Sequence, residues 1–248
     1  MKKKRKVGIG RDFMRKTQFK LMDPTDQSQN QPGPPGFYPP HPALPVIDLP
    51  DPQTVTLEEV SLRKAIEDRK SEREFLVDKS ITLDALSYLL WSTQGVKEAD
   101  QMDTFKTVPS AGARHPLETF LLIQRVDSLD TGLYRYIGPS HQLQNLQAGD
   151  DIVAAISATS LQPELIQNSL ATFIWTAVAY RTTWRYGDRG YRYIHLEAGH
   201  VGQNLYLASQ MVGCGVCTTA AFNDDDLNRA LGIDGNDRFA VYMGAIGK

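Results

Sequence analysis

Proline dominates the segment from Asp23 to Pro52, DPTDQSQNQPGPPGFYPPHPALPVIDLPDP, and restricts where the chain can form regular structure. Ten of the 14 prolines lie here. Proline lacks the amide hydrogen that helices and sheets use, so helix and strand pairing are excluded through most of the segment. It is predicted to be a linker or an arm that lies on the surface. Residues 1–53 are therefore taken as a basic, proline-rich N-terminal arm or linker, and residues 54–248 as the folded domain.

Apolar patterning predicts helices and buried strands within that domain. Thr56 with Glu59 forms a capping box, which predicts a helix through about Arg69. Thr82 predicts the start of a second helix, and Gly95 its end. Three apolar runs predict buried strands: 119–126, 171–180 and 238–246. Strands separated by helical segments indicate an α+β or α/β domain.

The longest predicted helix covers about 191–211 and carries two stripes of side chains. Its apolar positions alternate spacings of four and three, as one buried face requires: Ile194, Ala198, Val201, Leu205, Ala208 and Val212. The neighbouring stripe is small apart from Tyr206, and consists of Gly199, Gly202, Ser209 and Gly213. Small side chains permit close approach, either by another element of the same subunit or by the same helix of a second subunit. The pattern does not separate these alternatives.

Composition and charge narrow the class of protein. No apolar run approaches the roughly 20 residues of a membrane span, and no signal peptide is recognisable, so a cytoplasmic protein without membrane association is expected. Residues 1–20 hold nine basic residues and one acid, whereas the remainder holds 18 basic and 28 acidic residues. MKKKRKV resembles a nuclear-localisation or nucleic-acid patch, but the acidic remainder favours a solvated tail and no nucleic-acid partner.

Several motifs that carry chemistry elsewhere are weighed against simpler interpretations. Cys214 and Cys217 form a C-x-x-C pair, for which buried packing thiols are favoured over a redox pair or half a zinc site. The histidines of HLEAGH are five residues apart, so they do not share one helical face as metal ligands would, and no metal is expected. A structural or interface role is favoured for this motif.

Three scattered segments remain as candidate sites. Arg69, Ser71 and Arg73 alternate in DRKSEREF, so in an extended chain they point the same way and form an anion-binding row. PSAGARHP contains the small-residue turn Pro109, Ser110, Ala111 and Gly112, which suits close contact with a flat ligand or another chain. VYMGAIGK supplies Gly244, Gly247 and Lys248, the last a second candidate phosphate contact.

In this order, and with the helix through 199–215 and the turn TTAAF, these segments resemble the FMN-dependent nitroreductase family. PSAGARHPLE and YRYIHLEAGHVGQNLYLA resemble its SagB-type dehydrogenase branch in particular, and the resemblance covers Ser61 to Lys248. It implies an α+β fold with a central mixed or antiparallel sheet flanked by helices. It also implies an intertwined homodimer with one FMN in each of two sites at the subunit interface.

The resemblance also implies roles for individual residues. Arg69 and Ser71 would hold the FMN phosphate and ribityl end, with Arg73 nearer the ring edge. The turn Pro109–Gly112 would lie against the flavin bound mainly by the other subunit. A backbone N–H of Ala220 or Ala221 would meet flavin N5, where hydride enters from NAD(P)H and leaves to an acceptor in ping-pong fashion.

The substrate is less constrained than the cofactor. Some relatives in that branch oxidise azolines on ribosomal peptides, with a Lys-Tyr pair ahead of the long helix; here Arg185 and Tyr186 stand in those positions. A guanidinium is a poor base, although Tyr186 could still serve. A general FMN oxidoreductase acting on a nitro, quinone or related acceptor is therefore favoured over an azoline dehydrogenase. A non-catalytic flavin-binding or partner-binding subunit is the third alternative.

Overall fold

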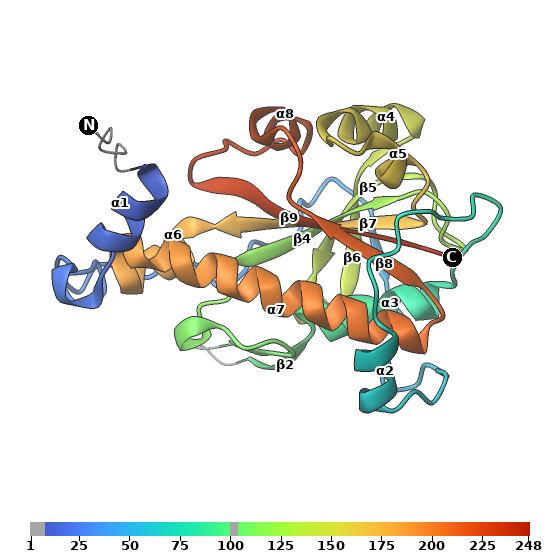
Figure 1. Cartoon of the computed structure of the whole chain (residues 1–248), viewed down its shortest axis with the longest axis horizontal. Coiled ribbons are helices and arrows are strands. Elements are labelled where there is room, and N and C mark those ends of the chain that lie inside the picture. Colours follow the sequence, from blue (N-terminus) through green and yellow to red (C-terminus); the bar gives the residue numbers. More distant parts are fainter. Residues whose placement is uncertain (1–7, 100–103) are drawn as a thin grey trace, which may run out of the picture.

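Antiparallel pairing joins seven strands of the computed structural model into one sheet in the order β1-β6-β5-β4-β7-β9-β8 (Figure 1). The structure describes residues 8–99 and 104–248. The strands of this sheet are β1 (Val46–Asp48), β4 (Leu117–Ile123), β5 (Gly132–Ile137), β6 (Gln142–Ala148), β7 (Ala171–Val178), β8 (Gly215–Thr219) and β9 (Arg238–Gly247). The three predicted apolar runs became β4, β7 and β9, the central strands of the sheet.

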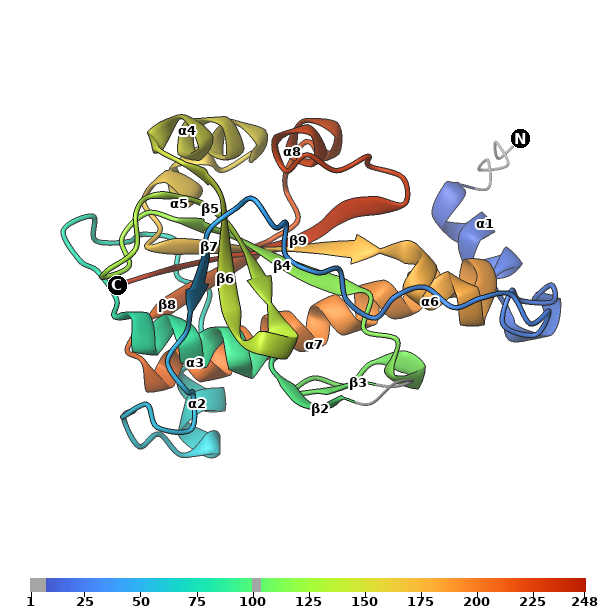
Figure 2. The ribbon, with the colours of Figure 1, turned by 180° about the vertical axis from the view of Figure 1, so that it is seen from behind.

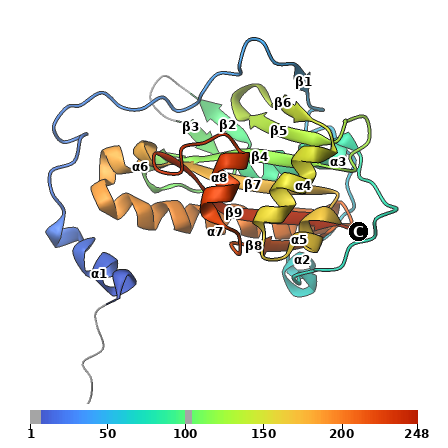
Figure 3. The same cartoon turned by 90° about the horizontal axis from the view of Figure 1, so that it is seen from above.

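Helices cover both faces of the sheet, which is why the interior strand β7 is buried at every position (Figures 1 and 3). One face carries α3 (Leu83–Gln94) and α7 (Gly190–Met211), and the other carries α4 (Asp150–Thr159), α5 (Pro163–Gln167) and α8 (Asp224–Ala230). Each face has its own cluster of buried apolar side chains. The architecture confirms the α+β prediction with an antiparallel sheet.

The long helix and the second helix form as the sequence predicts. The first five members of the apolar stripe of α7, Ile194 to Ala208, are buried against the sheet and α3. Thr82 caps α3 by accepting a hydrogen bond from the Ala85 N–H, and the helix ends before Gly95. Apolar periodicity and a capping side chain both act between residues close in sequence, so the helices that they predict are the ones observed.

The first helix differs from its prediction. The capping box at Thr56 and Glu59 is not used, and α2 (Leu62–Asp68) begins after Ser61, whose side chain accepts from the Lys64 N–H. The preceding residues are non-helical, and the Glu58 N–H donates to the Met211 carbonyl at the end of α7. A tertiary hydrogen bond thus replaces the first predicted turn.

The N-terminal arm lies on its own domain instead of extending as a linker (Figure 2). The first element of its described part is α1 (Ile9–Lys16), which ends before Thr17. The Thr17 carbonyl accepts a hydrogen bond from Arg189, and the Thr17 hydroxyl accepts one from Arg192. Farther along, β1 pairs with β6 in register Ile47↔Leu143 at the edge of the sheet. The predicted basic patch at residues 1–7 lies outside the described residues.

Three shorter elements lie outside the large sheet and its covering helices. β2 (Val96–Ala99) and β3 (Thr104–Lys106) pair as a separate two-stranded sheet, and α6 (Ala179–Tyr186) leads from β7 into α7. Among the described residues, no helix has the length and apolar character needed to cross a bilayer. Cys214 and Cys217 are buried free thiols, and burial raises the pKa of Cys214 to about 11. They therefore act as packing side chains, as expected.

Candidate functional site

The segment 69–73 runs beside the edge strand β8 and places the predicted anion-binding row there. Ser71 bridges to Val216 in parallel, and the Glu72 N–H donates to the Val216 carbonyl at 2.9 Å. This extended backbone follows the end of α2. Ser71, the middle residue of the predicted row, therefore lies at one margin of the sheet.

Tyr206 of α7 connects that row to the sheet. Its hydroxyl lies 2.8 Å from Ser71 Oγ, and the Arg69 guanidinium lies 5.2 Å from the centre of its ring. The same hydroxyl accepts from the Thr218 N–H at 3.1 Å, and Tyr242 donates to Thr218 Oγ1 at 2.6 Å. Ser71 is thus held in place by a network that sequence reasoning missed. The only signal was Tyr206 itself, the one large residue in a stripe of small ones.

The charges of the row are available to an anion. Neither Arg69 nor Arg73 forms an ion pair with a carboxylate within residues 8–99 and 104–248. The intervening acid, Glu72, pairs instead with Lys70 at 2.9 Å. Two guanidiniums and a positioned hydroxyl are the donor set that a terminal phosphate requires, so these residues fit the phosphate end of FMN.

The two glycines of β9 that were predicted to contact the cofactor have close neighbours within the fold. A Cβ at Gly244 would lie 2.7 Å from Leu205 Cδ2, and one at Gly247 would overlap the Phe75 ring. Close packing therefore explains both glycines. Lys248 is exposed, and its carbonyl accepts from the Leu76 N–H at 2.6 Å, which holds the end of the chain beside the segment that carries the anion-binding row.

The turn after β8 contains the two candidate backbone donors, Ala220 and Ala221, and one of them is already hydrogen-bonded. The Ala221 N–H donates to Thr219 Oγ1 at 3.0 Å, and its carbonyl accepts from the Leu161 N–H. Ala220 is exposed at the same turn. Of the two alanines, Ala220 is therefore the one whose N–H is the better candidate to meet a ligand.

The small-residue turn Pro109–Gly112 lies against the end of α6. Gly112 has φ +58°, and a Cβ there would lie 2.5 Å from the Tyr186 hydroxyl and 3.2 Å from the Arg185 guanidinium carbon. The chain thus brings this turn together with Arg185 and Tyr186, the two residues considered for azoline oxidation. The positive φ of Gly112 and the nearby Tyr186 hydroxyl explain, within one subunit, why glycine is required here. From the sequence alone, contact with a flavin explained the small residues of this turn.

His115, just before β4, and His200 of α7 hydrogen-bond to the turn. Ser110 Oγ accepts from the His115 N–H at 2.9 Å, and His200 Nδ1 lies 3.3 Å from the Pro109 carbonyl. His115 is itself buried, with Nδ1 3.5 Å from the Glu197 carboxylate. Of the HLEAGH side chains, Glu197 is thus buried while His195 and His200 are exposed, and the motif has the structural role that was favoured.

The stripe of small residues on α7 is divided between two environments. Gly202 is buried, and a Cβ there would lie 2.9 Å from the Tyr242 ring; Ser209 is also fully buried. Gly199 has open space around it, and its neighbour Leu196 is 60% exposed. Packing within one subunit, one of the two alternatives that the pattern left open, therefore explains Gly202 and Ser209.

The antiparallel sheet and the long helix α7 beneath it define an α+β protein. The Arg-x-Ser-x-Arg row at the margin of the sheet is its candidate anion site. The family model of the nitroreductase family matches residues 66–248. The chain therefore belongs to the nitroreductase family, whose members are generally oxidoreductases. A Methanocaldococcus jannaschii relative described as a nitroreductase is 35% identical over 75% of this chain and 89% of its own length.

A second relative and the solved structures extend the comparison. Trifolitoxin-processing protein TfxB of Rhizobium leguminosarum is 29% identical over 52% of this chain, which spans only 36% of that protein. A nitroreductase structure from Anabaena variabilis has a TM-score of 0.64 and 30% identity, covering 75% of this chain and 38% of that one. The chain thus spans well under half of both of these proteins.

Two further structures share the fold at low identity. The microcin synthetase McbBCD complex of Escherichia coli, solved with truncated pro-MccB17, matches with a TM-score of 0.59 and 19% identity, over 80% of this chain and 76% of that one. A nitroreductase of Desulfovibrio desulfuricans, solved with FMN, matches with a TM-score of 0.54 and 14% identity, over 77% and 87%.

Proposed function

We propose that this protein is an FMN-dependent oxidoreductase that passes hydride from NAD(P)H to an organic acceptor. The observation that carries the proposal is the row of Arg69, Ser71 and Arg73, in which two guanidiniums lack a carboxylate partner within the described residues and the hydroxyl is fixed by Tyr206. The FMN seen in the Desulfovibrio desulfuricans structure supports the choice of cofactor.

Each residue of the row has a distinct task in this proposal. Arg69 and Ser71 would bind the phosphate and ribityl end, with Lys248 as a further cation near the end of β9. Arg73 would stabilise negative charge on the ring. The Ala220 N–H would donate a hydrogen bond to the ring. Bound FMN would supply the hydride-accepting and hydride-donating chemistry, for which no side-chain base is needed.

We further propose a homodimer that completes each site. No hydrogen bond or ion pair in the described part of the chain joins the turn Pro109–Gly112 to the row at Arg69, so a second subunit would supply the turn. The exposed face of α7, with Leu196 and the open Gly199, is the surface on which it would pack. The donor and the acceptor would then bind in turn at one place, which predicts ping-pong kinetics.

Azoline oxidation in peptide processing is the second candidate, favoured by two comparisons and one contact. TfxB processes trifolitoxin, and the McbBCD complex was solved with a peptide precursor. Tyr186 lies beside the turn that the proposal places at the ring, where it could act as a base, whereas Arg185, 5.7 Å from its ring, could not. The arm contacts its own domain, so it gives no support to a partner-binding subunit.

Flavin titration of matched variants tests the cofactor site. Arg69→Ala should weaken FMN binding about 10- to 100-fold, since one charge-assisted contact is lost. Lys70→Ala is the control, because this neighbouring cation already pairs with Glu72. Equal FMN affinity in the two variants, or purified protein that stays colourless when FMN is added, would contradict the proposal. Turnover of an azoline peptide under air would promote the second candidate.

A further inference from the structure

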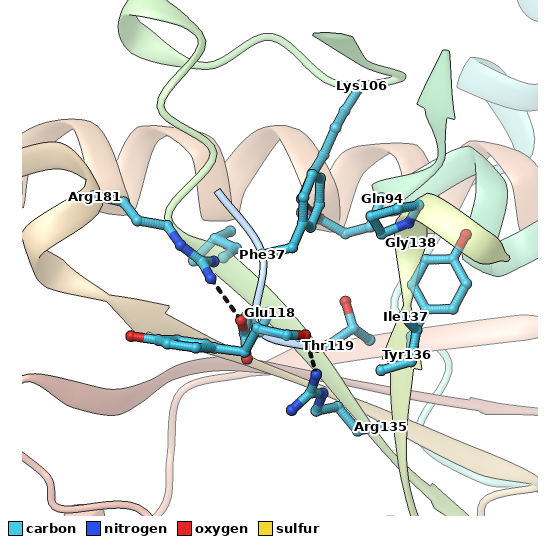
Figure 4. A pocket seen from close by; sticks show the side chains of 13 residues that line it. Phe37, Gln94, Lys106, Glu118, Thr119, Arg135, Tyr136, Ile137, Gly138 and Arg181 are labelled. Atoms are coloured by element: carbon cyan, nitrogen blue, oxygen red, sulfur yellow. Dashed lines mark hydrogen bonds and ion pairs between the residues drawn. The ribbon is translucent and has the colours of Figure 1, made fainter. Parts of the chain in front are cut away.

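A small, partly enclosed cavity between the sheet and the N-terminal arm has a strongly cationic lining (Figure 4). Its volume is about 30 Å³, enough for one or two particles of the size of water. Lys106, Arg135 and Arg181 line it, against the single carboxylate of Glu118. Lys106 and Arg181 are 8% and 2% exposed, so their charges are screened very little by solvent. This cavity is separate from the row at Arg69.

The one lining carboxylate is already shared. Glu118 accepts from Arg181 at 2.8 Å through one oxygen and lies 3.5 Å from Arg238 through the other. Lys106 donates to the Gln94 carbonyl oxygen at 2.6 Å, which is a neutral acceptor. Glu197 is a more distant carboxylate whose charge also reaches Lys106. The cations therefore exceed the carboxylates that contact them.

Two buried polar groups in the lining have no hydrogen-bond partner among the described residues. They are the Gln94 side-chain NH₂ and the Thr119 hydroxyl, on residues that are 2% and 1% exposed. Leaving a buried donor unpaired costs roughly 1–3 kcal/mol, so such groups normally have a partner. Both are donors, and together with the Lys106 ammonium they require an acceptor.

The arm forms one side of this cavity. Phe37 and Tyr38 line it, with the Lys106 ammonium 5.5 Å from the Phe37 ring centre and the Arg181 guanidinium 5.1 Å from that of Tyr38. Arg181 also donates to the Pro35 carbonyl at 3.0 Å, and Arg135 donates to the carbonyls of Tyr38 and Pro39. The cations of the lining thus hold the arm against the folded domain.

We propose that this cavity binds one monatomic anion, chloride in the cell, through Lys106, the Gln94 amide and the Thr119 hydroxyl, and that the anion stabilises the docked arm. The volume excludes phosphate or a nucleotide. The lowered pKa of Lys106, caused by burial, agrees with an ammonium that lacks a full counter-charge. An anion that binds only the folded state raises stability according to its concentration.

Bromide is the direct probe, because its anomalous scattering distinguishes it from water. A crystal of the full chain grown in sodium bromide should show one anomalous peak within contact of Lys106 and Thr119. In solution, sodium chloride should raise the melting temperature more than sodium gluconate at equal ionic strength. Hydrogen exchange at the Phe37 and Tyr38 amides should slow in the same buffer.

Variants assign the effect to the cavity. Thr119→Val keeps the shape of the side chain and should raise the half-maximal chloride concentration at least about tenfold. Lys106→Met should abolish the difference between chloride and gluconate. Lys64→Met, which removes an exposed lysine of α2, should respond as the wild type does. A cavity that holds only water in the bromide map would overturn the proposal, as would an unchanged chloride response in Thr119→Val. If either variant fails to fold, the wild-type bromide map decides.

Discussion

The stability of this protein should depend on pH through Lys106, and replacing that residue by methionine isolates the effect. Burial lowers the pKa of Lys106 from its ordinary 10.5 to about 8. At 1.36 kcal/mol per pKa unit, the charged form is disfavoured in the folded state by about 3 kcal/mol. The Lys106 side chain is enclosed by Phe37, Gln94 and the sheet, so water screens its charge very little.

The sign of the change in stability with pH follows from how many protons the folded and unfolded chains bind. Below about pH 8 both folded and unfolded chains carry the proton, and the folded state bears the full penalty. Between about pH 8 and 10.5 the unfolded chain binds more protons than the folded one, so stability rises with pH. Above 10.5 the penalty is gone. Lys106→Met lacks this titration, so the free energy of unfolding of the wild type should gain about 3 kcal/mol relative to the variant across that window.

Urea unfolding followed by tryptophan fluorescence measures the difference, in gluconate buffer without halide. Other groups that titrate in this window are common to both chains and cancel in the comparison. Lys64→Met controls for the loss of a lysine as such. A difference between wild type and Lys106→Met that stays flat from pH 7.5 to 10.5 would refute the reasoning. Added chloride should shift the rise to higher pH, since an anion favours the ammonium form.

Three further predictions concern the candidate site. Gly112→Ala should destabilise the fold by about 1–3 kcal/mol in urea unfolding, through its left-handed backbone and the Tyr186 hydroxyl, whereas Ala113→Gly, at φ 52°, should relieve strain. Tyr206→Phe should cost about 1–3 kcal/mol, because the Thr218 N–H loses its acceptor, and should also weaken FMN retention; unchanged retention would separate Tyr206 from the site. Tyr186→Phe should leave the rate of quinone reduction within a few-fold of wild type, because that reaction needs no side-chain base. A drop of about 10² to 10⁴ in rate, which is typical for the loss of a working base, would contradict this.

Local signals in the sequence predicted the scaffold well. The alternating three and four spacing of α7 survived because the sheet buries one face of that helix, and the three apolar runs became neighbouring central strands. The capping box at Thr56 and Glu59 failed for a tertiary reason, since the Glu58 N–H is used by the end of α7. Ser61, five residues beyond Thr56, offered an equivalent cap with no opposing contact.

The site was predicted only where its residues are neighbours in sequence. Arg69, Ser71 and Arg73 alternate within five positions, so their common direction was visible. Tyr206 and Thr218 come from different elements and meet Ser71 only through the packing of α7 on the sheet. The cavity at Lys106 joins α3, β3, β4, β5, α6 and the arm, which no spacing rule relates. The same holds for Gly202, because the stripe of small residues on α7 did not indicate which neighbour this glycine approaches.

The pairing of β1 with β6 bears on how the protein can be shortened for expression. A chain that began at Thr54 would keep every residue of the nitroreductase match, yet it would uncover the backbone of β6 at the edge of the sheet. His41 and Gln144, which exchange two hydrogen bonds at 2.9 Å, would also be separated. An unpaired edge strand is a template for pairing with another molecule. Such a truncated chain should accumulate as insoluble aggregates, and solubility would return only when the residues from Tyr38 onward are restored.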